Sequence, residues 1–404
     1  MSRANSQLLR HLINNPDEDD DAKEQPDYMN TRFLIISIFL TIAIFGGNVF
    51  TQEEANKSHN KAKQEQTIGK GSSLAVHNKF GAVIVTGWNS NILQASAMNV
   101  NTLQPIPVKI IQDSSNDKKF SIAPVPENKR LRSGDIALEV KVPRDVKLEP
   151  IRSDGSEVQI KNIDGLVAVT TDSGDVHIRS VGSLDIHTES GTVTVEDVTG
   201  SSIVQSSNGD ISAKNIKDDF TAKTENGNLR VENVGKILQV ITVNGNVTAQ
   251  NIQGNLGLVA VNGKINIRCV KGRVEINDAS SQIQLAGIEG DVEVTTSNGK
   301  ANFIGEIRVG KRYRLKTLSG AVSMLISDSL GFTATLSSYS GQVDSDFALG
   351  GKDPLSSNKK NRRLTGTIGD GQTQIEMDSF DGRVRLGKIS SEAIQKCSEV
   401  KTND

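Results

Sequence analysis

Glycine recurs at an almost constant spacing through the middle of this 404-residue chain. From Gly155 to Gly299 there are 144 residues over eight intervals, an average of 18, and Ser281 fills the one slot that lacks glycine. The glycines of this series are Gly155, Gly174, Gly191, Gly209, Gly227, Gly245, Gly263 and Gly299. A fixed period of this size predicts a solenoid, in which each repeat buries its apolar residues only by stacking on neighbouring repeats.

Within each repeat, apolar and polar residues alternate. After Gly227, for example, Leu229 and Val231 are apolar, whereas Asn228 and Arg230 beside them are polar. This period of two is typical of a strand with one buried and one solvated face. A second, weaker glycine series falls half a repeat later and precedes another apolar pair. Each coil is therefore predicted to contain two short strands.

The turns carry the residues that tight turns need. Asn-Gly or Ser-Gly pairs recur at the glycine positions, and Thr or Ser often stands three residues before the glycine. Glycine adopts positive φ freely and asparagine tolerates it. We expect stacked hydroxyls and amides to form hydrogen bonds along the solenoid axis. Asn-Gly also favours independent β-hairpins, which remain the alternative, but a hairpin sheet has no need for an even 18-residue period.

One long apolar run, FLIISIFLTIAIFGGNVF at residues 33–50, lies near the start. Its uninterrupted part is close to the shortest helix that spans a membrane. The leader before it is long and acidic, unlike the short basic leader of a cleaved signal peptide. We interpret 33–50 as an uncleaved transmembrane signal anchor. Cleavage near Gly46 or Gly47 and a buried helix of a soluble protein are the alternatives.

These features divide the chain into six segments. Residues 1–32 are a disordered acidic tail, 33–50 the transmembrane signal anchor, and 51–71 a linker. Residues 72–150 contain strand-like runs without the 18-residue period and are predicted to form an N-terminal β cap. Residues 151–387 are the β-solenoid repeats and 388–404 a C-terminal tail. The expected fold is an all-β, single-domain β-solenoid that follows one transmembrane helix.

Composition excludes several classes of function. The net charge of −2 provides no basic field for nucleic acid, and 4% aromatic residues are too few for base-stacking platforms. Two cysteines do not make a disulfide framework. Cys269 follows Ile267 in the alternating pattern and is expected to be a small core residue, whereas Cys397 lies in the tail with no evident partner.

Several motifs resemble a bacterial family named as putative adhesins, a domain of unknown function built from β-strand repeats. They are GAVIVTGW at 81–88, VKVP at 140–143, the repeats themselves, RLTGTIGDG at 363–371 and SFDGRVR at 379–385. The similarity extends over about residues 72–387. It implies a β-solenoid, often tethered to a membrane and facing outside the cytoplasm, and it brings no catalytic residues.

Candidate sites are few. The densest basic cluster, formed by Lys359, Lys360, Arg362 and Arg363, suits an anionic partner such as lipid headgroups, cell-wall polymers or acidic glycans. A solvated loop is the alternative interpretation of the same residues. No residue set indicates catalysis, a metal ion or a cofactor.

The leading hypothesis is a non-catalytic, membrane-anchored β-solenoid whose repeats face the periplasm or the extracellular space. It would act as an adhesin or as an envelope binding or scaffold module, held in the membrane by residues 33–50. Two alternatives remain, a self-assembling scaffold that joins end to end like bactofilins and a polysaccharide-active β-helix enzyme. The sequence names neither the ligand nor the oligomeric state.

Overall fold

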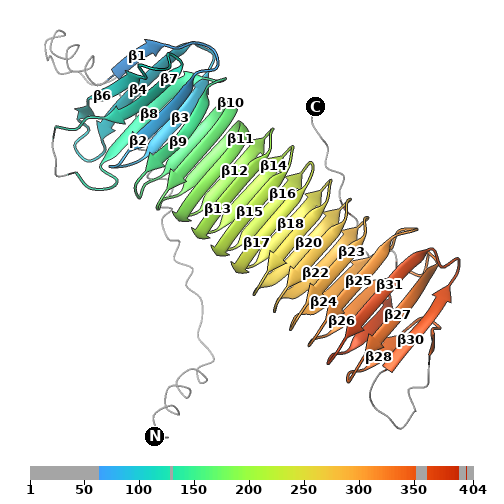
Figure 1. The fold of residues 1–404 in the computed structure, drawn as a ribbon. Coiled ribbons are helices and arrows are strands. Elements are labelled where there is room, and N and C mark those ends of the chain that lie inside the picture. Colours follow the sequence, from blue (N-terminus) through green and yellow to red (C-terminus); the bar gives the residue numbers. More distant parts are fainter. Residues whose placement is uncertain (1–62, 128–130, 352–361, 391–396, 398–404) are drawn as a thin grey trace, which may run out of the picture. The chain divides into compact units, whose positions relative to one another are not determined.

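Backbone hydrogen bonds between equivalent positions of successive repeats build this fold. In the computed structural model, Ile211 pairs with Leu229 and Val231 with Ala249, always in parallel and 18 residues apart. The model describes residues 63–127, 131–351, 362–390 and 397, which contain strands and turns and no helix. Figure 1 shows the strands stacked side by side along the solenoid. The parallel pairing confirms the solenoid and rules out a series of independent hairpins.

Each regular coil contributes one strand to each of two sheets. Two long strands, β10 (Val158–Thr171) and β11 (Val176–Ser190), run through both sheets. The first sheet continues with β12 (Val193–Val198), β14 (Ile211–Ile216), β16 (Leu229–Val234), β18 (Val247–Ile252), β20 (Lys264–Val270), β22 (Gln282–Ile288), β24 (Lys300–Gly305) and β26 (Val322–Ile326). The second continues with β13 (Ser202–Asn208), β15 (Phe220–Asn226), β17 (Leu238–Asn244), β19 (Leu256–Ala260), β21 (Val274–Asp278), β23 (Val292–Thr296) and β25 (Arg312–Thr317).

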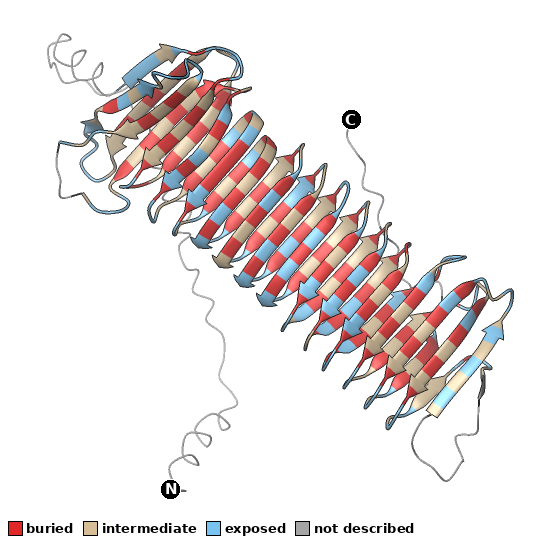
Figure 2. Ribbon diagram, viewed as in Figure 1, coloured by how far each residue is buried: buried red, intermediate tan, exposed pale blue. Residues whose placement is uncertain are grey.

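The core is a continuous apolar column between the two sheets. Val195, Ala213 and Val231 occupy the same place in successive coils and are at most 1% exposed. Figure 2 shows buried and solvated residues alternating along the strands, with the buried ones recurring at the same level from coil to coil. The alternation in the sequence therefore predicted which residues form the core.

A left-handed residue turns the chain from the first sheet toward the second. Asn215, Asn233 and Asn251 occupy this corner with φ near +60°, and the residue after each is a buried valine or isoleucine. The left-handed conformation interrupts the alternation, so that the following side chain points inward. The Asn233 side chain donates to that of Asn215 (2.7 Å), and Asn251 donates to Asn233 (3.0 Å). The corner thus carries a ladder of amide hydrogen bonds parallel to the axis.

The expectation for the two cysteines was wrong. Cys269 occupies the left-handed corner with φ of 58°, where it is half-buried, and the core position belongs to the next residue, Val270. Cys269 forms a disulfide with Cys397, with 5.6 Å between the Cα atoms. In the next coil the corner residue is Gly287, where a Cβ would lie 2.5 Å from the Cys397 sulfur. Glycine there makes room for the tail cysteine.

Hydroxyl residues line a second column, three residues before most of the turn glycines. Their side chains are buried, and several bond to turn backbone, as when Thr171 donates to the carbonyl of Ser153 one coil earlier (2.7 Å), whereas the hydroxyls of Ser206 and Thr242 have no hydrogen-bond partner within the described residues. In one coil Asp278 takes this place and accepts from the Ser281 amide (2.7 Å) and the Thr296 hydroxyl (2.7 Å). The asparagines beside the turn glycines form a further ladder, which confirms that amides bond along the axis.

Chain order and stacking order differ at the N-terminal end. The strands there are β1 (Lys63–Thr67), β2 (Ser73–Asn78), β3 (Val83–Trp88), β4 (Ile92–Asn99), β5 (Pro105–Ile106), β6 (Val108–Gln112), β7 (Lys119–Pro124), β8 (Ile136–Pro143) and β9 (Lys147–Ser153). β2 lies between β7 and β9, and β3 lies between β8 and β10, all in parallel. β1, β4, β5 and β6 make antiparallel pairs outside them.

The C-terminal end is closed in a similar way. The strands are β27 (Phe332–Ser338), β28 (Val343–Ser345), β29 (Gly350–Gly351), β30 (Arg362–Ile368), β31 (Thr373–Ser379) and β32 (Val384–Lys388). β31 lies between β25 and β27, and β32 between β26 and β28. β30 then pairs with β27 in the antiparallel direction, and β29 pairs with β30.

Residues 33–50, which the sequence predicts to be a membrane anchor, lie outside the described residues. Within the described part, none of the secondary structure is a helix of the length and apolarity that crossing a membrane requires.

Candidate functional site

The second sheet ends in a charged surface that differs from the rest of the solenoid. Its strands follow the order β23, β25, β31, β27 and β30. Because side chains alternate along a strand, every second residue of β25 points outward. These residues are Arg312, Arg314 and Lys316, which follow one another between the acidic and polar residues of β23 and β31.

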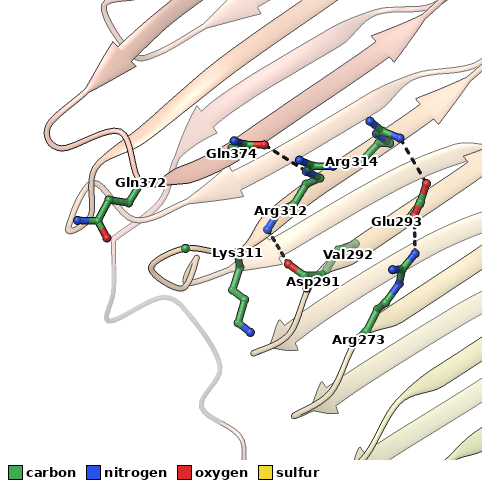
Figure 3. Close-up of a pocket in the computed structure, with 10 residues that line it drawn as sticks. Arg273, Asp291, Val292, Glu293, Lys311, Arg312, Arg314, Gln372 and Gln374 are labelled. Atoms are coloured by element: carbon green, nitrogen blue, oxygen red, sulfur yellow. Dashed lines mark hydrogen bonds and ion pairs between the residues drawn. The ribbon is translucent and has the colours of Figure 1, made fainter.

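A first hollow of about 330 Å³ lies beside β25 (Figure 3). Four cations and two carboxylates line it, and some of these charges are paired. Glu293 receives Arg273 at 2.6 Å and Arg314 at 3.6 Å, and the backbone amide of Arg312 donates to Asp291 at 2.8 Å. Glu293 therefore holds two of its arginines, whereas Lys311 and Arg312 form no ion pair within the described ranges, and no large exposed apolar side chain lines this hollow.

A second hollow, of about 710 Å³, lies at the C-terminal ends of β25, β31 and β27, and we call it the C-terminal hollow. Its lining residues are Thr295, Thr296, Ser297, Lys316, Thr317, Leu318, Ser337, Ser338, Tyr339, Arg362, Arg363, Asp378, Ser379 and Phe380. It combines three cations, one carboxylate, several hydroxyls and three large apolar side chains.

Two of the four basic residues singled out in the sequence line this hollow. Arg362 and Arg363 begin β30, where they pair with Ser338 and Ser337 of β27. Neither arginine forms an ion pair with another residue of the described ranges. Lys359 and Lys360 lie outside the described residues.

Lys316 is the third cation of the hollow and is partly neutralised. Its ammonium group lies 2.9 Å from Glu376, which also receives the Arg314 guanidinium at 2.8 Å. Partial burial raises the pKa of Glu376, but the hydrogen bonds and positive charges of Lys316 and Arg314 outweigh it, so the pKa lies below its usual value. The carboxylate of Asp378 accepts a hydrogen bond from Ser337 (2.7 Å).

Three exposed apolar side chains stand in a row at the rim, and we call them the apolar ridge. Leu318, Phe380 and Tyr339 follow the last residues of β25, β31 and β27, and they are 58%, 51% and 37% exposed. The Tyr339 and Phe380 rings are stacked, with centroids 4.6 Å apart and planes 8° from parallel. An amphiphilic hollow of this kind is suited to binding an anionic group attached to an apolar body.

Lys316 and the apolar ridge were not predicted from the sequence. The signal was present, because the residue two positions before the turn glycine is polar or small in many coils, such as Glu189 and Glu225. It becomes leucine, tyrosine and phenylalanine in the coils that end at Gly320, Gly341 and Gly382. Large apolar residues at a solvated position are informative, and a count of basic residues alone did not find them.

No group of three or more His, Cys, Asp and Glu side chains in the described ranges is arranged to hold a metal ion. His177 lies 3.7 Å from Glu157, and His187 lies 3.3 Å from Asp185. Each of these two histidines therefore lies beside one carboxylate on the solvated surface.

Comparison with known proteins gives a family. The family model described as Toastrack DUF4097 matches residues 101–236 and 214–386, which together cover well over half of the chain. No curated protein matches the sequence.

Solved structures similar to this chain include three bacterial proteins. A "putative cell adhesion protein" from Clostridium sporogenes is 9% identical over 81% of this chain and 99% of its own, with a TM-score of 0.15. A "putative adhesin" from Bacteroides fragilis is 12% identical over 81% and 96%, with a TM-score of 0.24. A "putative lipid binding protein" from Parabacteroides distasonis is 13% identical over 66% and 96%, with a TM-score of 0.29. At these identities and TM-scores no ligand is transferred to this chain.

Proposed function

The chain belongs to the Toastrack DUF4097 family, and we propose that it is a non-catalytic binding module of the cell envelope. In this proposal residues 33–50 anchor it in the membrane, the solenoid faces the periplasm or the extracellular space, and the C-terminal hollow binds an anionic partner. The sequence of the apolar run supports the anchor, and its length is near the minimum that spans a bilayer.

The observation that carries the binding role is the gathering of Lys316, Arg362 and Arg363 around one hollow. Elsewhere on the solenoid, outward polar groups are often used internally, as in the ladder that joins Asn208, Asn226 and Asn244. Groups that bond to the neighbouring coil stabilise the stack and contribute little to a ligand. Arg362 and Arg363, which have no ion pair within the described ranges, keep their donors for a partner.

The disulfide between Cys269 and Cys397 supports a location outside the cytoplasm. Disulfides persist in oxidising compartments and are rare where thiols are kept reduced. The antiparallel strands at both ends argue against the end-to-end scaffold, because β4 and β30 cover the parallel strands on which another copy would stack.

Cell fractionation tests the location. We expect the full chain to stay with membranes after alkaline carbonate extraction and to release with residues 33–50 deleted. We also expect intact, unreduced cells to give no maleimide-PEG shift at Cys269 or Cys397, and reduced samples to give two. Recovery as a soluble cytosolic protein with two free thiols would reject the envelope role.

Titration with a labelled polyanion, dextran sulfate, tests the binding role on the full chain in neutral detergent. Binding should weaken as salt rises, and K316Q/R362Q/R363Q should weaken it at least tenfold. Failure of the wild-type chain to bind would reject the anionic partner. Release of reducing ends or unsaturated sugars from envelope glycans would instead support the enzyme alternative.

A further inference from the structure

The C-terminal hollow places an apolar edge directly beside positive charge. The backbone amide of Phe380 donates to the carbonyl of Thr317, and that of Tyr339 donates to Ser379 (both 3.2 Å). These bonds hold the three ridge residues in adjacent turns, on the side of the hollow that solvent reaches. Contiguous apolar side chains that stay exposed and are bordered by polar groups mark interaction surfaces.

The apolar ridge favours a partner without a fixed shape. Tyr339 and Phe380 are stacked on each other, and Leu318 stands beside Phe380 in the neighbouring turn. The ridge therefore presents two rings and a branched aliphatic side chain as one contiguous apolar edge. Such an edge can enter a fluid apolar medium without requiring a matched shape.

The cations select the charge of the partner. The hollow holds Lys316, Arg362 and Arg363 against one carboxylate of its own, Asp378, which also accepts a hydrogen bond from Ser337. Guanidinium groups match phosphate oxygens in a bidentate fork, and an ammonium group serves as a point charge. The side chains therefore favour phosphate groups that lie next to hydrocarbon.

We propose that the C-terminal hollow is a contact site for a membrane surface rich in anionic phospholipid. The headgroup phosphates pair with Lys316, Arg362 and Arg363, while Leu318, Phe380 and Tyr339 enter the boundary between headgroups and acyl chains. This inference rests on the proposed binding role and names the partner of the same site. Val243 and Val261 occupy the equivalent exposed slot nearer the middle of the solenoid, so apolar residues recur along the same corner.

Vesicle recruitment tests the proposal on the full chain. The protein is reconstituted in neutral phosphatidylcholine vesicles, which accommodate any membrane-spanning segment. It is then mixed with dye-filled vesicles that are either purely phosphatidylcholine or contain about 30% phosphatidylglycerol. We expect recruitment of the anionic vesicles only, and progressive loss of recruitment as salt shortens the electrostatic range.

Two variants separate the contributions of charge and apolar contact. K316Q/R362Q/R363Q should weaken recruitment of anionic vesicles by up to about a hundredfold, since each basic residue near such a surface contributes about fivefold. L318S/F380S should weaken it at least tenfold and leave its salt dependence unchanged.

A matched control removes the same number of charges from the other sheet. Lys214, Lys264 and Lys300 are exposed on β14, β20 and β24, and K214Q/K264Q/K300Q should recruit vesicles within twofold of the wild-type chain. Circular dichroism confirms that each variant keeps its strands.

Equal recruitment of neutral and anionic vesicles, an equal loss in the control variant, or no effect of L318S/F380S would overturn the lipid proposal. Binding of dextran sulfate through the same cations without vesicle recruitment would also overturn it, while the anionic-partner proposal would stand. Absence of both activities would reject the two together.

Discussion

At the corner that carries the amide ladder, we expect a glycine substitution to destabilise the fold less than an alanine substitution. Asn233 has φ of 60°, donates to Asn215 at 2.7 Å and accepts from Asn251 at 3.0 Å. Asn233→Ala and Asn233→Gly both remove the two hydrogen bonds. Water replaces them in part at this solvated corner, so the loss is about 1 kcal/mol in each variant.

The two variants differ in backbone preference. Alanine at positive φ costs a further 1 to 2 kcal/mol, roughly, because its Cβ approaches the following carbonyl. Glycine avoids that cost but loses about 0.5 to 1 kcal/mol through the entropy of the unfolded chain. We therefore expect Asn233→Ala to lower the free energy of unfolding by about 2 to 3 kcal/mol. The loss in Asn233→Gly should be smaller than the loss in Asn233→Ala by roughly 1 kcal/mol.

Urea unfolding measures this difference. Circular dichroism and the fluorescence of Trp88, which lies in the N-terminal strands, should give the same midpoint if unfolding is cooperative. Ser212, on the extended strand β14, is the control, because there alanine should be more stable than glycine by about 0.5 to 1 kcal/mol. An Asn233→Ala variant as stable as Asn233→Gly would refute the role assigned to the corner.

Three further predictions concern stability. Reduction, or Cys397→Ser, opens the link to Cys269 across 128 residues, so the free energy of unfolding from urea titration should fall by at most about 5 kcal/mol, and reductant should have no further effect on Cys397→Ser. Asp278→Ala should lower the free energy of unfolding by about 2 to 3 kcal/mol. Because Asp278 and Ser281 share hydrogen bonds, Ser281→Gly should cost much less in the Asp278→Ala variant than in the wild-type chain. Strict additivity of the two losses would contradict this. The pKa of Glu376 is lowered in the folded chain, so its ion pairs stabilise the fold above the unfolded pKa of 4.5. This stabilisation is lost as the pH falls through the pKa of the folded state. The difference in melting temperature between wild type and Glu376→Gln should therefore shrink between about pH 6 and about pH 3.

The sequence was most informative where one physical rule acted alone. Alternation identified buried residues such as Val195 and Val231 because a strand offers only an inner and an outer face. It failed at Cys269, because a single left-handed residue reverses the alternation and local pattern does not reveal φ. The other members of that column are mostly asparagine, a residue that tolerates positive φ and so marks the corner.

The candidate site was only half predictable. Arg362 and Arg363 stood out by charge density, and both reach the C-terminal hollow. Lys316 and Phe380 joined them through stacking that departs from chain order, since β31 inserts between β25 and β27. Neither residue spacing nor composition carries information about such an insertion, so only the structure could bring these segments together.

The uniform separation of paired strands also bears on how the chain acquires its structure. Each regular coil pairs with the coil made 18 residues earlier. The solenoid can therefore fold coil by coil while later residues are still being synthesised. The bond between Cys269 and Cys397 is different, because it joins residues 128 positions apart and waits until the intervening coils have been made. Oxidation of that pair would then report that those later coils are in place.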